Sequence, residues 1–164
     1  DGFVVARHLH IRGATVAVFL VADAARIAGD AAIHLRIIRN LGLDVRAPAP
    51  SELASLAGAL RGFDLVVDAV GGTGIRGALK GEQAVAVGQI NAAGRPVVAL
   101  DIPTGLDCDT GAAEGPVVRA QLTVTFHARK KGFDAPGAAA YTGRVVVADI
   151  GVPGPASART QTTD

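Results

Sequence analysis

The 164-residue chain lacks several features that would place it in a specialised class. Its single cysteine, Cys108, excludes an intramolecular disulfide framework and a cysteine-based zinc cage. No apolar run reaches the roughly 18 residues that a membrane span needs. The formal net charge of +1 lacks the basic excess typical of a surface for nucleic acid or membranes. We therefore expect a globular domain without nucleic-acid or membrane partners, and a cytoplasmic location because one thiol suits a reducing compartment.

The pattern of apolar residues predicts alternating strands and helices. Strands are expected over 15–21, 44–47, 63–70, 96–102, 121–127 and 144–150. Helices are expected over 1–12, 23–41 and 80–93, with shorter ones from Ser51 and over 136–141, and an irregular segment over 103–115. This alternation is typical of an α/β domain, a Rossmann-like three-layer αβα sandwich with a mainly parallel sheet. Residues 153–164 have the composition of a linker or tail.

Two of the predicted strands end in an aspartate that is followed by a glycine-containing turn. Asp68 precedes the stretch Gly71–Gly77, and Asp101 precedes Pro103, Thr104 and Gly105. In open α/β sheets, ligands bind at the carboxyl ends of the strands. Glycines there allow a phosphate to approach backbone N–H groups. The two strand ends therefore predict one shared ligand site.

Each of these features also has a simpler explanation. The letters Gly72-x-Gly74-x-x-Gly77 match a dinucleotide fingerprint, but a plain dinucleotide-dependent oxidoreductase would carry that fingerprint after its first strand. An ordinary tight turn is the simpler alternative for the glycine loop. Asp68 could cap the turn that follows it, and Asp101 could bind ribose hydroxyls only.

Five strings, in this order, resemble the YjeF N-terminal domain family, the NAD(P)H-hydrate epimerases. They are DGFVVARHL at 1–9, VVDAVGGTGIRG at 66–77, ALDIPTGLDCDTG at 99–111, TVTFHARKKG at 123–132 and YTGRVVVADIG at 141–151. The resemblance covers residues 1–152 as one domain, truncated at its N-terminus. It implies an isomerase that interconverts the R and S epimers at C6 of hydrated NADH or NADPH, in nicotinamide cofactor repair. It also implies a bound potassium ion, a homodimer and, in many bacteria, fusion to a dehydratase.

The resemblance places the family's functional residues on this chain. It assigns potassium ligation to Asp68 and Thr104, and substrate binding to Asp1, Gly72, Thr73, Gly74, Ile75, Arg76, Gly77, Ala78, Asp101 and Lys130. For Lys130, a solvated basic loop is the simpler interpretation. Asp101 is also our candidate catalytic residue. We expect the C6 hydroxyl to leave, giving an iminium-like ring that a carboxylate stabilises while shuttling the proton.

The chain departs from the family pattern in three places. It lacks the asparagines and first glycines of an N-N-G-G-D-G loop, of which Asp1 and Gly2 match the last two residues, and the strand and helices that precede that loop. Gly71 stands where the family tends to have an aromatic residue, and Thr104 stands where it usually has serine. The alternative function is therefore a non-catalytic binding or dimerisation module of the same fold.

Overall fold

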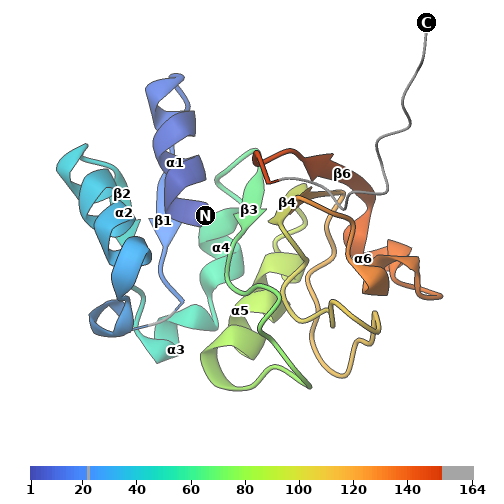
Figure 1. Ribbon diagram of the computed structural model, residues 1–164. Coiled ribbons are helices and arrows are strands. Elements are labelled where there is room, and N and C mark those ends of the chain that lie inside the picture. The colour runs from blue at the N-terminus through green and yellow to red at the C-terminus, as the bar shows by residue number, and fades with distance from the viewer. Residues whose placement is uncertain (22, 153–164) are drawn as a thin grey trace, which may run out of the picture.

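The computed structural model describes residues 1–21 and 23–152, so the predicted tail at 153–164 lies outside the described residues. All strand pairs in this part of the chain are parallel. They form a two-stranded sheet, β1–β2, and a four-stranded sheet in the order β3-β4-β5-β6 (Figure 1). The strands are β1 (Ala17–Phe19), β2 (Asp44–Arg46), β3 (Val66–Asp68), β4 (Val97–Leu100), β5 (Leu122–Phe126) and β6 (Arg144–Ala148). The predicted α/β fold is confirmed, with its parallel sheet in two parts.

Helices cover both faces of the sheet at β1, as the alternation of its side chains shows. Val16 and Val18 pack in a cluster with Leu35 and Ile38, residues of α2 (Gly29–Asn40), and with residues of α1 (Gly2–Ile11). Phe19 packs instead against the cluster that joins α3 (Pro50–Leu53), α4 (Leu56–Leu60) and α5 (Gly81–Ala92) to β3 and β4. Because successive strand residues point to opposite faces, this gives three layers.

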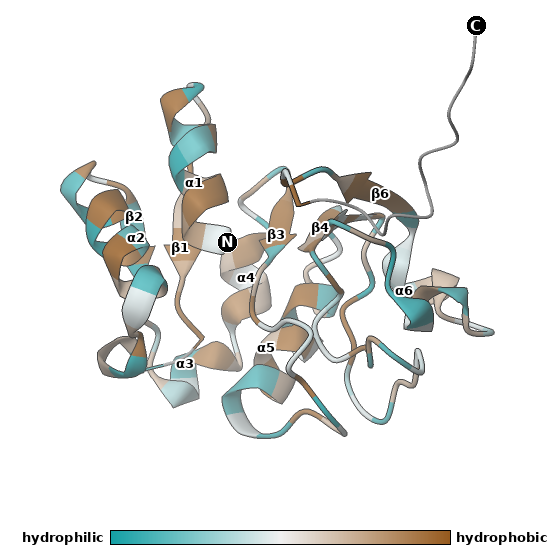
Figure 2. Ribbon diagram, viewed as in Figure 1, coloured by the Kyte–Doolittle hydropathy of each residue, from teal (hydrophilic) through white to brown (hydrophobic). Residues whose placement is uncertain are grey.

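Apolar side chains supply the strands and the buried faces of the helices. Figure 2 shows β3 and β6 largely in the brown of hydrophobic residues, whereas α1 and α5 carry both colours. Ile38 and Val87 are fully buried, and burying a side chain of this kind stabilises the fold by about 1.5–3 kcal/mol. None of the helices in 1–21 and 23–152 is both long enough and apolar enough to cross a membrane.

The helix predicted over 23–41 is interrupted near its start. Asp23 does act as a cap, accepting a hydrogen bond from Ala25 N, but it opens only a 3-10 turn, η1 (Ala24–Arg26). Ile27 is then extended and Gly29 has a φ of 58°, so the α-helical hydrogen bonds begin at Gly29. The prediction failed because the apolar period continued through a glycine that has a positive φ here.

The carboxyl ends of β3, β4 and β5 lead into the loops that hold the candidate residues. Asp68 is the last residue of β3 and pairs with Ala99 of β4, two positions before Asp101. The segment 103–115 contains no regular element, as predicted. It is followed along the chain by β5, the 3-10 turn η2 (Lys131–Asp134), the short helix α6 (Ala139–Thr142) and β6. Both acidic strand ends therefore lie at the same edge of the four-stranded sheet.

Candidate functional site

Asp68 and Thr104 are in direct contact at the end of β3. Thr104 N donates to Asp68 Oδ2 at 2.8 Å, and Thr104 Oγ1 donates to Asp68 Oδ1 at 2.7 Å. The threonine hydroxyl also accepts a hydrogen bond from Gly71 N at 2.9 Å. Asp68 is 1% exposed and Thr104 is fully buried. The two residues assigned to a cation by the family resemblance therefore form one buried oxygen cluster.

The Asp68 carboxylate has no ion-pair partner among residues 1–21 and 23–152. Burial raises the pKa of Asp68, and the hydrogen bonds from Thr104 and Val70 oppose that rise in part. Val70 N donates to Asp68 Oδ1 at 3.2 Å, which is the turn-capping contact of the simpler explanation. Turn capping and cation binding are compatible, because a carboxylate has about four acceptor positions.

Asp101 occupies an unusual backbone conformation immediately after β4. Its φ is 63°, and Ile102 N donates to Leu100 O at 2.8 Å across it. A hydrogen bond from residue i+2 to residue i around a positive φ defines the rare and strained form of the γ-turn. Such a conformation costs of order 1–3 kcal/mol for a non-glycine residue and is often found at functional sites. The strand end thus holds this side chain in one fixed direction.

The Asp101 carboxylate is directed toward β5 and the loop after it. Asp101 Oδ1 accepts from Thr125 Oγ1 at 3.1 Å and from Phe126 N at 3.0 Å, and it forms an ion pair with Lys130 Nζ at 2.7 Å. Partial burial raises the pKa of Asp101, but these hydrogen bonds and the Lys130 charge outweigh it, so the pKa lies below its usual value. Asp101 is therefore an ionised, paired carboxylate, unlike Asp68.

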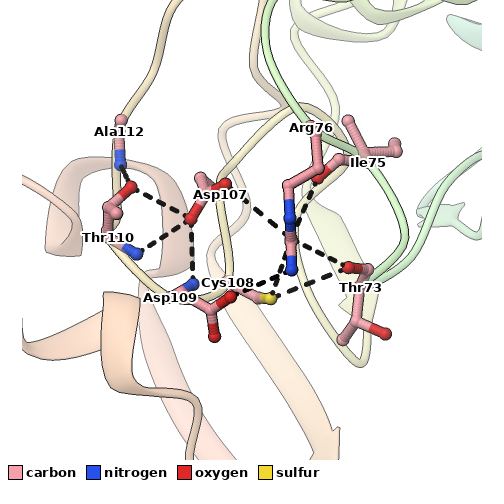
Figure 3. Close-up of polar contacts among 8 residues, drawn as sticks. All are labelled: Thr73, Ile75, Arg76, Asp107, Cys108, Asp109, Thr110 and Ala112. Atoms are coloured by element: carbon pink, nitrogen blue, oxygen red, sulfur yellow. Dashed lines mark hydrogen bonds and ion pairs between the residues drawn. The ribbon is translucent and has the colours of Figure 1, made fainter.

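The glycine loop 72–78 is held to the loop after β4 by Arg76 (Figure 3). Arg76 Nη2 lies 2.9 Å from Asp109 Oδ2, and Arg76 Nη1 lies 3.8 Å from Asp107 Oδ2 and 3.4 Å from Cys108 Sγ. Its guanidinium also donates to Thr73 O at 3.1 Å. The Arg76 charge is thus shared with two carboxylates. To bind a phosphate, Arg76 would have to use its remaining N–H donors or exchange its carboxylate partners for the phosphate.

The remaining predicted substrate residues fall into two groups. Thr73, Gly74, Gly77 and Ala78 are exposed, and Ile75 N donates to Gly72 O at 3.1 Å, so the loop also forms the predicted tight turn. Gly2, next to Asp1, lies so close to β3 that a Cβ on it would be 2.6 Å from Ala69 Cβ. The amino end of α1 therefore lies beside the residue that follows Asp68.

The structure thus assembles two clusters rather than one. The first comprises Asp68, Thr104 and the start of the glycine loop, and the second comprises Asp101 and Lys130. No group of three or more His, Cys, Asp or Glu residues in the described ranges could hold a metal ion. A cation at Asp68 would accordingly need hydroxyl and carbonyl oxygens as its other ligands. Hard cations prefer such oxygen ligands.

His127 was not among the residues predicted for the site. It follows β5 as Asp101 follows β4, with a φ of 64° and a hydrogen bond of 2.7 Å from Ala128 N to Phe126 O across it. Two adjacent strands therefore end in the same strained turn. Nothing in the sequence indicates this, because the residue type that tolerates such a φ is glycine and neither position carries one.

These features define the chain as a Rossmann-like α/β domain in which the carboxyl ends of the strands, where ligands bind in open α/β sheets, carry acidic and glycine-rich turns. The family model described as YjeF-related protein N-terminus matches residues 1–132. The chain belongs to this family.

Curated relatives and one solved structure are similar to most of the chain. It is 47% identical to the bifunctional NAD(P)H-hydrate repair enzyme Nnr of Moorella thermoacetica, over 93% of this chain and 29% of that protein. It is 42% identical to the NAD(P)H-hydrate epimerase of Rhodopirellula baltica, over 93% of this chain and 62% of that protein. The crystal structure of yeast ynu0, YNL200c, has a TM-score of 0.66 at 22% identity and matches 80% of this chain and 54% of that one. The chain thus spans less than a third of the bifunctional relative and somewhat under two thirds of the epimerase.

Proposed function

We propose that the chain is an NAD(P)H-hydrate epimerase domain, which interconverts the R and S epimers at C6 of hydrated NADH or NADPH. The observation that carries this proposal is the 42% identity to a protein named NAD(P)H-hydrate epimerase, over 93% of this chain. The placement of Asp68 and Asp101 at one edge of the sheet supports it, because that edge is where ligands bind in such folds. The non-catalytic alternative has no comparable observation in its favour.

The proposed reaction needs groups that position the substrate and a group that stabilises the charge of the ring. The exposed backbone of the glycine loop would hold the diphosphate, with Arg76 nearby. The fixed negative charge of Asp101 would stabilise the cationic ring that remains when the C6 hydroxyl leaves. Water returning to the opposite face of C6 would then give the other epimer.

We propose that Asp68 and Thr104 hold a potassium ion. The fit rests on the buried Asp68 carboxylate, which has hydrogen-bond donors around it but no cationic side chain in the described residues. Such a charge is costly to bury alone, and a cation would offset that cost. When bound, the ion would supply a fixed positive charge at Asp68 and Thr104. Asp68 and Thr104 themselves order the start of the glycine loop through Gly71 N.

We also propose that the protein is a homodimer and that it is cytoplasmic, because a single thiol suits a reducing compartment. Some relatives are bifunctional repair enzymes, so we also propose that the domain can act next to a dehydratase. Light scattering of the purified chain between low and high micromolar concentration tests the dimer, and a constant monomer mass would contradict it.

The activity is tested by adding the purified chain to a single epimer of hydrated NADH and separating the epimers by chromatography. We expect interconversion faster than in the protein-free sample, and faster in potassium chloride than in sodium chloride at equal ionic strength. A rate equal to that of the protein-free sample would contradict the epimerase and favour the binding module.

A further inference from the structure

The ion pair between Asp101 and Lys130 has unused hydrogen-bonding capacity on both partners. All three contacts to the carboxylate, from Thr125 Oγ1, Phe126 N and Lys130 Nζ, are made to Oδ1. In the described residues, Oδ2 has no hydrogen-bond partner. Lys130 Nζ donates to Asp101 Oδ1 and to Phe126 O, the latter at 3.2 Å, and an ammonium group has three donors. One carboxylate oxygen and one N–H therefore remain for a ligand.

The position of this pair limits what each partner can do. Both side chains are 20% exposed, so they are accessible yet shielded on most sides. The Asp101 backbone is fixed by its γ-turn, and Lys130 is fixed by two acceptors. Because Lys130 and the β5 contacts hold the pKa of Asp101 below its usual value, the carboxylate has no proton to donate near neutral pH. Within the pair, Lys130 Nζ is the hydrogen-bond donor and Asp101 is the acceptor.

We propose that Lys130 is the group that protonates the C6 hydroxyl of the hydrate as it leaves, and that accepts a proton from water when the hydroxyl is restored. This inference rests on the proposed epimerase function. Asp101 then acts as the fixed negative charge that faces the cationic ring through Oδ2. The two catalytic roles are thereby divided: the carboxylate stabilises charge and the ammonium group moves the proton.

The proposed step conserves atoms and electrons. The C6–O bond breaks, its electron pair leaves with oxygen, and one proton from Lys130 Nζ converts the departing hydroxide to water. The ring becomes an iminium-like cation and Lys130 becomes a neutral amine. A water molecule then adds to the other face of C6 and gives a proton back to Lys130, so no oxidant or reductant takes part.

The test compares Lys130→Met with Lys130→Arg, using Lys131→Met as the matched control. Lys131 is the neighbouring exposed lysine and makes no side-chain hydrogen bond or ion pair in the described residues. Methionine removes charge and proton, whereas arginine keeps the charge but does not deprotonate in proteins. We expect both Lys130 variants to lose about 10²–10⁴-fold in kcat, the usual contribution of general acid–base catalysis, with a smaller change in KM. The Lys131 variant should match the wild type.

The pH dependence provides a second measurement that a purely structural role would not change. The residual rate of Lys130→Met should rise as pH falls within the range where circular dichroism shows the fold intact, because solvent protons replace the missing acid. In Lys130→Met, the carboxyl carbon of Asp101 should also titrate at higher pH than in the wild type, as followed by carbon-13 NMR, which checks the ion pair itself and not the proton transfer.

Three outcomes would overturn the inference. Near wild-type kcat in Lys130→Arg would show that only the positive charge matters, and near wild-type kcat in Lys130→Met would show that the side chain is not needed. In both cases the active wild type would leave the epimerase proposal standing. A wild-type chain that does not interconvert the epimers would instead contradict the proposed function, and the role of Lys130 with it.

Discussion

The two acidic strand ends have the same sequence pattern but opposite surroundings. Asp68 ends β3 in a fully buried position, receives only hydrogen bonds, and its pKa is raised by burial. Asp101 follows β4 in a strained turn, is paired with Lys130 at 2.7 Å, and has a lowered pKa. Each is an aspartate at the carboxyl end of a neighbouring parallel strand. The opposite pKa shifts therefore come from the neighbours of each carboxylate in the fold, not from the strands that carry them.

One edge of the sheet thus holds two carboxylates in opposite electrostatic surroundings. A buried carboxylate without a counter-charge favours either a proton or a cation, so it suits an ion site. A carboxylate paired with lysine stays charged, so it suits stabilisation of a cationic ring. The decisive partners are Thr104 for the first and Lys130 for the second. Each of the following predictions removes or changes one side of this contrast.

The largest effect is expected for Asp101→Asn. The amide oxygen can still accept from Phe126 N and Thr125 Oγ1, so the fold should persist, but the negative charge near the substrate is lost. We expect epimerisation to fall by about 10²–10⁴-fold with an unchanged circular dichroism spectrum. An active Asp101→Asn variant would mean that this carboxylate serves only to bind the substrate.

Asp68→Ala should affect stability more than any other substitution in the first cluster. It leaves the buried Thr104 N and the partly buried Val70 N without their acceptor. We expect the free energy of unfolding in urea to fall by about 1–3 kcal/mol, the cost of an unsatisfied buried polar group. Asp64→Ala is the control, because Asp64 is exposed and its side chain makes no hydrogen bond or ion pair in the described part of the chain. Equal losses in the two variants would contradict the structural role of Asp68.

The two carboxylates should give the stability of the protein opposite responses to pH. The raised pKa of Asp68 contributes stability that is present below the usual value of 3.8 and is lost as pH rises through the folded pKa. The lowered pKa of Asp101 contributes stability that is present above 3.8 and is lost as pH falls through its folded pKa. Each group can change the free energy of unfolding by at most about 1.4 kcal/mol per pH unit.

Unfolding in urea at several pH values, without potassium, separates these contributions. As pH rises from 4 toward 7, the free energy of unfolding of Asp68→Asn should increase relative to that of the wild type. The increase should be at most about 1.4 kcal/mol for each pH unit. Added potassium should stabilise the wild type more at the higher pH, because the ion competes with the proton for the carboxylate. A wild type that responds equally to potassium and sodium would argue against an ion at Asp68.

The layered fold could be predicted largely from the sequence because its signals are periodic. The apolar runs around Val66–Asp68 and Val97–Leu100 specified buried parallel strands, and glycines marked the ends of the helices. The predicted strands were longer than those observed, since apolar residues continue beyond the hydrogen-bonded pairs. The interruption of the helix predicted over 23–41 was not predicted, because Gly29 lies inside an otherwise helical pattern.

The site could be predicted only in part. The structure brings Asp68 and Thr104 into contact, and their assignment to one ion by the family resemblance stays a prediction. The partners of Asp101 and Arg76 did not follow from the sequence, because Lys130, Asp107 and Asp109 lie in loops that have no period. Contacts between such loops depend on the tertiary arrangement, and local propensity does not encode it.

Arg76→Gln should have the smallest effect, and it tests the connection between the two strand ends. Arg76 lies in the loop after Asp68 and contacts the loop after Asp101 through Asp109. Both side chains are well exposed, at 58% and 63%, so solvent screening leaves the pair only a small contribution to the free energy of unfolding. The KM should rise by up to about tenfold, because the glycine loop loses its attachment. Arg36→Gln, an exposed residue of α2, should change neither quantity. A large loss of stability with an unchanged KM would mean that Arg76 supports the fold and not the substrate loop.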